Sequence, residues 1–309
     1  CACLVGSEMC IRDRCRALRA KLALHEGIPA ESILCGNGAA DLIFRLAWAA
    51  KPRTALVTAP TFAEYAAALE SAGCAVRRHF LQAEVDFAVT DSILSSITPE
   101  VDMVFLCQPN NPTGQLTPLP LVERILRRCE ACGALLVVDE CFLDFLPDCD
   151  TLTAKTLLDS KNLLILKAFT KLYGMAGVRL GYCLCANTAL LEAMQAAGQP
   201  WAVSSLAQAA GLAALDETAY VAQVRALIAQ QRPRLTAGLR ALGLRVLDGR
   251  ANYLLFQGPE TLGDALRQWG VVLRSCSNYP GLDGSWYRTA VRTAPENQQL
   301  LKTLQEVLA

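Results

Sequence analysis

The sequence has no excess of charge of either sign, because 29 lysines and arginines balance 29 aspartates and glutamates over 309 residues. Without a basic excess or an acidic tail, the composition gives no support to a nucleic-acid partner. No uninterrupted apolar run is long enough to cross a bilayer, although 53% of the residues are hydrophobic. Internal repeats and low-complexity segments are lacking too. The composition therefore predicts a large buried core, and neither a membrane partner nor a largely disordered chain is expected.

The sequence contains 14 cysteines but lacks a complete set of metal ligands. Cys129 and Cys132 form a CxxC pair in a helix-like stretch, without a second CxxC or a histidine pair. Because one pair cannot complete a four-ligand site, we expect no metal and interpret most cysteines as small core residues. A zinc or redox role of the pair is the alternative. The start lacks the ordered regions of a signal peptide, and a reducing cytoplasm is expected.

Short apolar runs alternate with helical patterns over most of the chain. Strand-like runs lie at 32–35, 54–58, 74–80, 101–107, 134–138, 162–168 and 178–185, with helical patterns at 39–48, 65–72 and 121–132. This alternation predicts an α/β fold with a mainly parallel sheet sandwiched by helices. A long helical region at 202–242, interrupted at Pro233, then leads to strands at 244–247, 253–256, 271–274 and 287–291 and helices at 262–269 and 300–308. We expect a large domain over residues 15–198 and a smaller α+β domain over residues 199–309.

Four polar clusters follow predicted strands, at the positions where α/β sheets hold ligands. Gly36–Asp41 precede a helix whose free N–H groups can face a phosphate. The turn at 109–114 (PNNPTG) holds two asparagines between two prolines, and Asp139 ends a buried strand, where an unpaired carboxylate is costly. Lys171 is followed by glycines and by Arg179, as an imine-forming lysine and a phosphate clamp would require. Each cluster alone is also compatible with a turn, a helix cap or a solvated charge.

In this order, the four clusters resemble the fold-type I, pyridoxal-phosphate-dependent aminotransferase family of class I and II. The likeness covers residues 15–309 and is carried by PTFAEY (60–65), QPNNPTG (108–114), PW (200–201) and GRANYLLF (249–256). The stretch LRSCSNYPGLDGSWYRTAVRT (273–293) is similar to the threonine-phosphate decarboxylase branch of cobalamin synthesis. The histidinol-phosphate aminotransferase branch is the alternative. A non-catalytic member of the family is disfavoured, because such a protein would not need Lys171, Asp139 and Arg179.

The resemblance implies pyridoxal 5'-phosphate as the cofactor. Lys171 matches the lysine that bonds the cofactor covalently and then carries a proton, and Asp139 matches the carboxylate that keeps the pyridine nitrogen protonated. Asn111 matches the amide that bonds the ring 3-oxygen, and Phe62 holds the position that stacks on the ring. The cofactor phosphate would be bound by the backbone of Ala39 and Ala40, the hydroxyl of Thr170 and the guanidinium of Arg179.

The same resemblance implies a phosphorylated amino-acid substrate and a homodimer. Arg288 matches the arginine that grips the substrate α-carboxylate, and Arg274 is the candidate for the substrate phosphate. Arg292 and Asn252 are further candidates for this pocket. The implied reaction is the decarboxylation of L-threonine O-3-phosphate to (R)-1-aminopropan-2-yl phosphate.

The sequence also departs from the family pattern. Ala168 stands where many relatives carry Ser or Thr, Phe142 replaces a frequent Tyr, and the pair Ala39-Ala40 lacks polar side chains, so a lower cofactor affinity is expected. In the family an arm before Cys15 covers the active site. Residues 1–14 show no clear period, and residues 4–14 resemble the translated read of a sequencing adaptor. We therefore expect a non-native leader at 1–14 and a missing arm.

Overall fold

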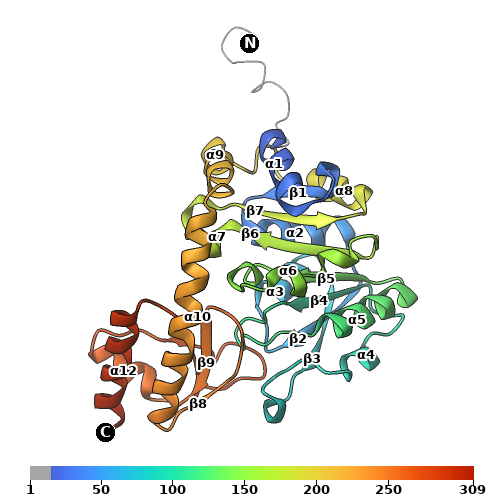
Figure 1. Cartoon of the computed structure of the whole chain (residues 1–309). Coiled ribbons are helices and arrows are strands. Elements are labelled where there is room, and N and C mark those ends of the chain that lie inside the picture. Colours follow the sequence, from blue (N-terminus) through green and yellow to red (C-terminus); the bar gives the residue numbers. More distant parts are fainter. Residues whose placement is uncertain (1–14) are drawn as a thin grey trace.

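Seven strands form the larger of two sheets in the computed structural model, which describes residues 15–309; the predicted leader at 1–14 lies outside the described residues. The strands are β1 (Ile33–Gly36), β2 (Thr54–Ala59), β3 (Ala75–Phe80), β4 (Met103–Cys107), β5 (Leu135–Asp139), β6 (Leu163–Ala168) and β7 (Gly181–Cys185). They lie in the order β1-β7-β6-β5-β4-β2-β3 (Figure 1). Strands β2 to β6 pair in parallel, and β7 is antiparallel to β1 and β6. The predicted α/β fold with a mainly parallel sheet is confirmed.

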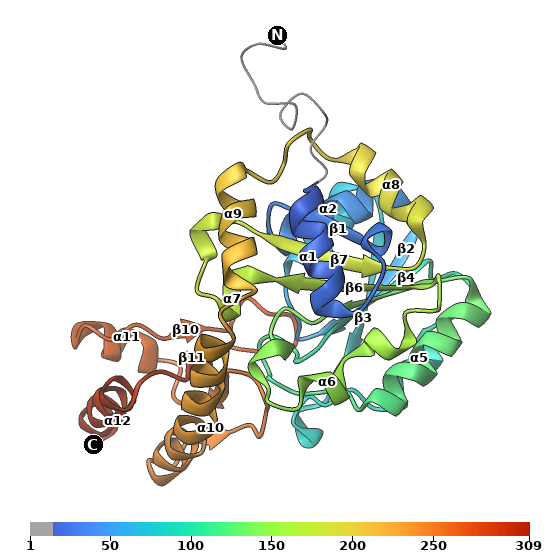
Figure 2. The ribbon, with the colours of Figure 1, turned by 45° about the horizontal axis from the view of Figure 1, so that its top comes forward.

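Helices cover both faces of this sheet (Figure 2). The helices α2 (Gly38–Ala50), α3 (Glu64–Ser71) and α8 (Thr188–Ala197) pack on one face. The other face is covered by α1 (Arg16–Glu26), α4 (Ile93–Ser96), α5 (Leu119–Cys132) and α9 (Ser205–Ala214). Because side chains alternate along a strand, Leu164 and Leu166 of β6 join the α2 side, whereas Leu163 and Ile165 join the α1 side. This double burial explains the continuous apolar runs of the central strands.

The smaller sheet has four antiparallel strands: β8 (Arg245–Val246), β9 (Tyr253–Gln257), β10 (Arg274–Ser275) and β11 (Trp286–Ala290), in the order β10-β11-β9-β8. Three helices pack against it, namely α10 (Thr218–Ala241), α11 (Leu262–Gln268) and α12 (Ala294–Leu308). Helix α10 is the longest, and it extends from the large sheet to the small one (Figure 1). Two short helices, α6 (Cys149–Leu152) and α7 (Phe169–Leu172), lie beside the large sheet.

The predicted interruption of the long helical region at Pro233 is wrong, because α10 continues through that residue. A proline removes one helical N–H and is unfavourable inside a helix. Ile228 on one side of the proline and Leu235 and Leu239 on the other are buried, so tertiary packing holds the helix together. The break lies instead between α9 and α10.

Helix α9 begins the predicted C-terminal domain, yet it packs on α1. A Cβ atom at Gly211 would lie 2.5 Å from Leu180 and 3.1 Å from Leu18, so the absence of a side chain there permits the close approach. The division between residues 198 and 199 therefore stays a prediction.

The CxxC pair lies in α5, where its thiols meet no further ligands. Burial raises the pKa of Cys129 to about 12, and Cys132 Sγ lies 3.7 Å from the carbonyl oxygen of Ile97. Within residues 15–309, no group of three His, Cys, Asp or Glu side chains is arranged to hold a metal. In the same part of the chain, no helix has both the length and the apolar character needed to cross a membrane.

Candidate active site

Asp139 lies at the carboxyl end of β5, on the face of the sheet that α3 covers. Its side chain is only 6% exposed. The hydroxyl of Tyr65 donates to Asp139 Oδ2 at 2.5 Å, and the backbone N–H of Cys141 donates to Oδ1 at 3.0 Å. The carboxylate is therefore held at both oxygens, which offsets the cost of burying it.

Glu140 follows directly in sequence but belongs to the opposite face, because successive strand residues alternate. It is fully buried. Its carboxylate accepts hydrogen bonds from the Thr153 hydroxyl and the Ala154 N–H, both at 2.7 Å. The two adjacent carboxylates thus serve different places in the fold.

The turn between β1 and α2 meets Arg179 at the amino end of α2. Gly38 has a φ of 81°, which favours glycine, and a Cβ there would lie 2.7 Å from Arg179 Nη2; a Cβ at Gly181 would lie 2.6 Å from the backbone nitrogen of Ala39. The preceding residue, Asn37, makes no side-chain capping bond to this helix. The first amides of α2 are thus combined with a guanidinium, which is an arrangement suited to a phosphate.

Lys171 lies on the short helix α7, directly after β6. Its side chain is exposed, and its Nζ atom lies 5.3 Å from the centre of the Phe142 ring. Phe142 in turn meets the ring of Tyr253 edge-on at 5.1 Å. Burial and the charge of Asp139 raise the pKa of Cys141 well above its usual range, and the charge of Lys171 acts against this rise.

A cavity of about 840 Å³ connects Lys171 with the small sheet. Its lining includes the four residues predicted to bind substrate, namely Asn252, Arg274, Arg288 and Arg292. Arg274 and Arg288 are direct cross-strand partners in β10 and β11. The cavity therefore combines a lysine amine with paired guanidinium groups.

Asn111 connects this cavity with the turn after β4. Its side-chain oxygen accepts hydrogen bonds from Arg288 Nη1 and, at 3.4 Å, from the hydroxyl of Tyr279. The guanidinium of Arg288 also lies 5.1 Å from the ring centre of Tyr253, whose hydroxyl donates to the carbonyl of Asn110 at 2.9 Å. A hydrogen-bonded link thus joins the small sheet to the large one.

The remaining predicted site residues are less closely tied to the cavity. Phe62 is half-buried and lies edge-on to Tyr65 at 5.5 Å, and Ala40 and Thr170 are half-buried near the ends of β1 and β6. Arg292 pairs with Glu296 at 3.1 Å. Asn252 has a buried side-chain oxygen without a hydrogen-bond partner among the described residues, so a donor on a ligand would satisfy it.

These features fit pyridoxal phosphate by their donor chemistry. The amino end of α2 and Arg179 suit its phosphate, Asp139 suits a protonated pyridine nitrogen, and Lys171 supplies an amine for its aldehyde. The fit rests on the narrow approach of Arg179 to Gly38 and on the fully anchored carboxylate of Asp139.

Three tyrosines of the site were not assigned roles by the sequence: Tyr65, Tyr253 and Tyr279. Each is at most 6% exposed, and each donates a hydrogen bond to the site or its turn. Their signal was limited to membership in the segments PTFAEY, GRANYLLF and the 273–293 stretch, because an aromatic residue in such a segment also suits a core.

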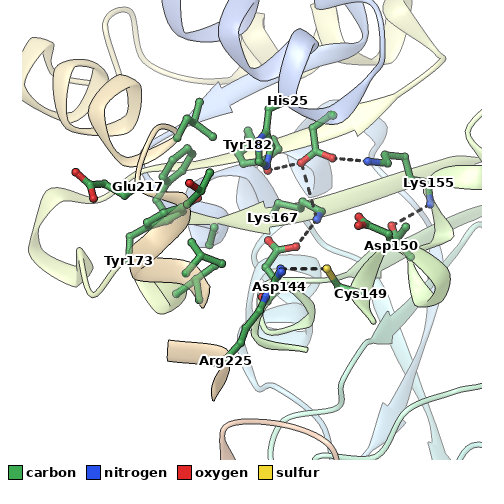
Figure 3. A pocket seen from close by; sticks show the side chains of 18 of the residues that line it. His25, Asp144, Cys149, Asp150, Lys155, Lys167, Tyr173, Tyr182, Glu217 and Arg225 are labelled. Carbon is green, nitrogen blue, oxygen red and sulfur yellow. Dashed lines mark hydrogen bonds and ion pairs between the residues drawn. The ribbon is translucent and has the colours of Figure 1, made fainter. Parts of the chain in front are cut away.

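A second cavity, of about 340 Å³, lies on the α1 side of the sheet, and its lining includes Phe169 and Leu172 of α7 (Figure 3). Lys167 of β6 is its central charge: Nζ lies 2.7 Å from Asp144, 3.8 Å from Glu26 and 3.9 Å from Glu140. Glu26 also accepts from the Tyr182 hydroxyl at 2.5 Å. We call these residues, with Lys155, the buried charge network.

Within the buried charge network, the pKa of Glu26 is lowered, whereas the pKa values of Lys167 and Glu140 are raised. Burial alone would raise the pKa of Glu26, but the charges of Lys167 and Lys155 and the Tyr182 hydrogen bond lower it to about 2. Burial alone would lower the pKa of Lys167, yet Asp144, Glu26 and Glu140 raise it. For Glu140, burial dominates and raises the pKa to about 7.

Replacing Glu140 with glutamine is expected to change how stability depends on pH. Because the folded carboxyl has a pKa of about 7 against an ordinary 4.5, the folded chain holds this proton more tightly, and stability falls as pH rises from 4.5 to 7. The glutamine cannot ionise and keeps hydrogen-bonding groups for Thr153 and Ala154. From pH 5 to pH 8, the variant should gain about 2–3 kcal/mol in unfolding free energy relative to the wild type.

Urea unfolding at several pH values measures this difference. The exposed Glu192 on α8 provides the control, and Glu192→Gln should show no such trend. A constant difference between Glu140→Gln and the wild type over this pH range would contradict the assignment.

Comparisons with known proteins identify relatives of the chain. The sequence profile of the family "Aminotransferase class I and II" matches residues 13–304. The chain is 40% identical over 295 residues to the threonine-phosphate decarboxylase of Salmonella typhimurium, covering 94% of this chain and 81% of that protein. It is 35% identical over 306 residues to a histidinol-phosphate aminotransferase of Desulfitobacterium hafniense, with coverages of 94% and 81%. The crystal structure of the histidinol-phosphate aminotransferase from Clostridium acetobutylicum matches with a TM-score of 0.89 at 27% identity, covering 95% of this chain and 89% of that chain.

Proposed function

The chain belongs to the pyridoxal-phosphate-dependent aminotransferase family of class I and II, and we propose that it decarboxylates L-threonine O-3-phosphate. The product would be (R)-1-aminopropan-2-yl phosphate, the linker used in cobalamin biosynthesis. The observation that carries this proposal is the pairing of Arg274 with Arg288 across β10 and β11, beside Lys171.

Two cross-strand arginines suit a substrate with two anionic groups. Directly opposite residues in an antiparallel pair have neighbouring side chains, so one substrate can reach both guanidinium groups. In the proposed site Arg288 holds the α-carboxylate, and Arg274 holds the phosphate. With both ends fixed, the bond between Cα and the carboxylate can be oriented for cleavage.

The chain's own residues have separable roles in this proposal. Bound pyridoxal phosphate supplies the electron sink for the bond that breaks at Cα. Asp139 holds the proton at the pyridine nitrogen, Asn111 orients the ring through its amide, and Lys171 holds a proton at Nζ that it can return to Cα. Arg179 and the first amides of α2 anchor the phosphate of the cofactor.

The reaction is tested by incubating the protein and pyridoxal phosphate with threonine phosphate, in one assay for released CO₂ and another for glutamate formed from 2-oxoglutarate. Release of CO₂ with aminopropanol phosphate as product supports the decarboxylase. Transfer of the amino group without CO₂ would overturn it.

The second candidate is a histidinol-phosphate aminotransferase, which the 35% identical relative favours. The substrate in that name, histidinol phosphate, has a phosphorylated alcohol group in place of the amino-acid carboxylate. This phosphate is the only anionic group of the amino donor, whereas the acceptor 2-oxoglutarate has two carboxylates that could reach both arginines. Formation of glutamate from 2-oxoglutarate, with histidinol phosphate as the amino donor, is the measurement that favours this candidate.

Replacing Arg274 with alanine is expected to lower kcat/KM for threonine phosphate about 10- to 100-fold, the range of a hydrogen bond to a charged group. The slow reaction of unphosphorylated threonine should change little, because threonine has no phosphate for Arg274 to bind. Arg292→Ala is the matched comparison, since Arg292 lines the same cavity but is paired with Glu296. An equal loss with both substrates would show that Arg274 does not recognise the phosphate.

We further propose that the chain acts as a homodimer in solution, as the family resemblance implies. The exposed Trp201 and Leu206, at 68% and 82% exposure, offer apolar surface beside α9 for such a contact.

A further inference from the structure

We propose that Tyr65 is a positioning residue that holds Asp139 in the orientation required by the pyridine nitrogen of the cofactor. The inference rests on the proposed function only for the cofactor's presence at Asp139. The geometry within the chain stands by itself.

The hydrogen bond from Tyr65 joins two residues that are 74 positions apart in the sequence, at a distance of 2.5 Å. Tyr65 is fully buried. Burial and the nearby charge of Asp139 raise the pKa of Tyr65 well above its usual range, so the hydroxyl keeps its proton and acts as the donor. Together with the Cys141 N–H on the other oxygen, it restricts rotation of the carboxylate.

The ring of Tyr65 is fixed as firmly as its hydroxyl. It stacks on Phe105 of β4 at 4.7 Å and 19°, and it meets Phe62 edge-on at 5.5 Å and 80°. Phe62 is the residue expected to stack on the cofactor ring. Tyr65 therefore contacts both Phe62, which would stack on the cofactor ring, and Asp139, which would pair with its nitrogen.

This arrangement gives Tyr65 two effects on Asp139. It supplies a charge-assisted hydrogen bond to the buried carboxylate, and it limits the positions that Oδ2 can adopt. Without the hydroxyl, the carboxylate has only the Cys141 anchor described above, and its hold on the pyridine proton weakens.

The test replaces Tyr65 with phenylalanine, which keeps the ring and its stacking. In the apoprotein, we expect hydrogen exchange at the Cys141 amide to become about tenfold faster, because its acceptor is less firmly held. With ¹⁵N-labelled pyridoxal phosphate bound, the nitrogen resonance should move toward the unprotonated position, and the dissociation constant of the cofactor should rise about tenfold.

Tyr182→Phe is the matched control. It also removes a buried tyrosine hydroxyl that donates to a carboxylate at 2.5 Å, but this carboxylate is Glu26 on the other face of the sheet. The control should lose stability and leave the Cys141 exchange and the nitrogen resonance unchanged. Equal changes in both variants, or none in Tyr65→Phe, would overturn the proposal.

A third variant, Asp139→Asn, separates this inference from the proposed function. If Tyr65 acts through Asp139, adding Tyr65→Phe to Asp139→Asn should give no further change in the nitrogen resonance, whereas additive changes would contradict the proposal. If the wild type binds no pyridoxal phosphate, the proposed function fails, and the Cys141 exchange still decides whether Tyr65 holds Asp139.

Discussion

Replacing Lys171 with alanine is expected to abolish the absorption band that pyridoxal phosphate acquires in the protein and to lower turnover of threonine phosphate by at least about a thousandfold. The reason is that the lysine would supply both the covalent attachment and the proton carried at Nζ, and each contribution is large. Because the side chain is exposed and ends in the 840 Å³ cavity, its loss should leave the fold intact.

Absorption spectra of both proteins with pyridoxal phosphate, followed by CO₂ assays, measure the effect of Lys171→Ala. Lys161→Ala is the control, since Lys161 is an exposed lysine just before β6. If the wild type shows the absorption band but releases no CO₂, the result supports the cofactor site and favours the aminotransferase. A band that persists without Lys171 would contradict its assignment.

Replacing Lys167 with methionine is expected to lower the free energy of unfolding by about 3 kcal/mol or more. The variant keeps the volume of the side chain but leaves Asp144 and Glu26 without their shared buried cation, and breaking a buried pair costs about 3–5 kcal/mol. Because Phe169 and Leu172 of α7 line the same cavity as the network, the loss of the Lys167 charge should also loosen α7, the helix that carries Lys171.

Denaturant unfolding at several pH values measures the effect of Lys167→Met. Since the folded pKa of Glu26 is about 2, its contribution is present above its ordinary pKa and is lost as the pH falls toward 2; the variant should reduce this dependence. Lys155→Met is the comparison, because Lys155 also bonds Glu26 but is more exposed. Losses of similar size in both variants would contradict a central role for Lys167.

Much of the site could be predicted because its residues stand at strand ends. Buried parallel strands read as apolar runs, and the polar residues directly after them lie at the ligand-binding edge of the sheet. This position points to Lys171, Asp139 and Asn111, whereas Arg274 and Arg288 follow from the family resemblance. The mainly parallel sheet followed from the same alternation of strands and helices.

The rest depends on pairings between distant segments. Asp139 and Glu140 are adjacent in the sequence, but the pleat of β5 sends them to opposite faces, toward Tyr65 and toward Lys167. The partner of Asp139 lies 74 residues away, and no local pattern distinguishes it from a core tyrosine. The sequence predicts a break at Pro233 because the cost of a proline in a helix is local, while the packing that outweighs this cost is not.

The strand pattern, the residues that end each strand and the family to which they conform can all be read from the order of the amino acids. That Arg274 faces Arg288, that Tyr65 donates to Asp139 and that Lys167 is surrounded by three carboxylates became evident from the folded chain. The physical reason is that backbone propensities and hydrophobic periodicity act over a few residues. Strand register and the alternation of faces instead arise from burial shared by segments far apart in the chain.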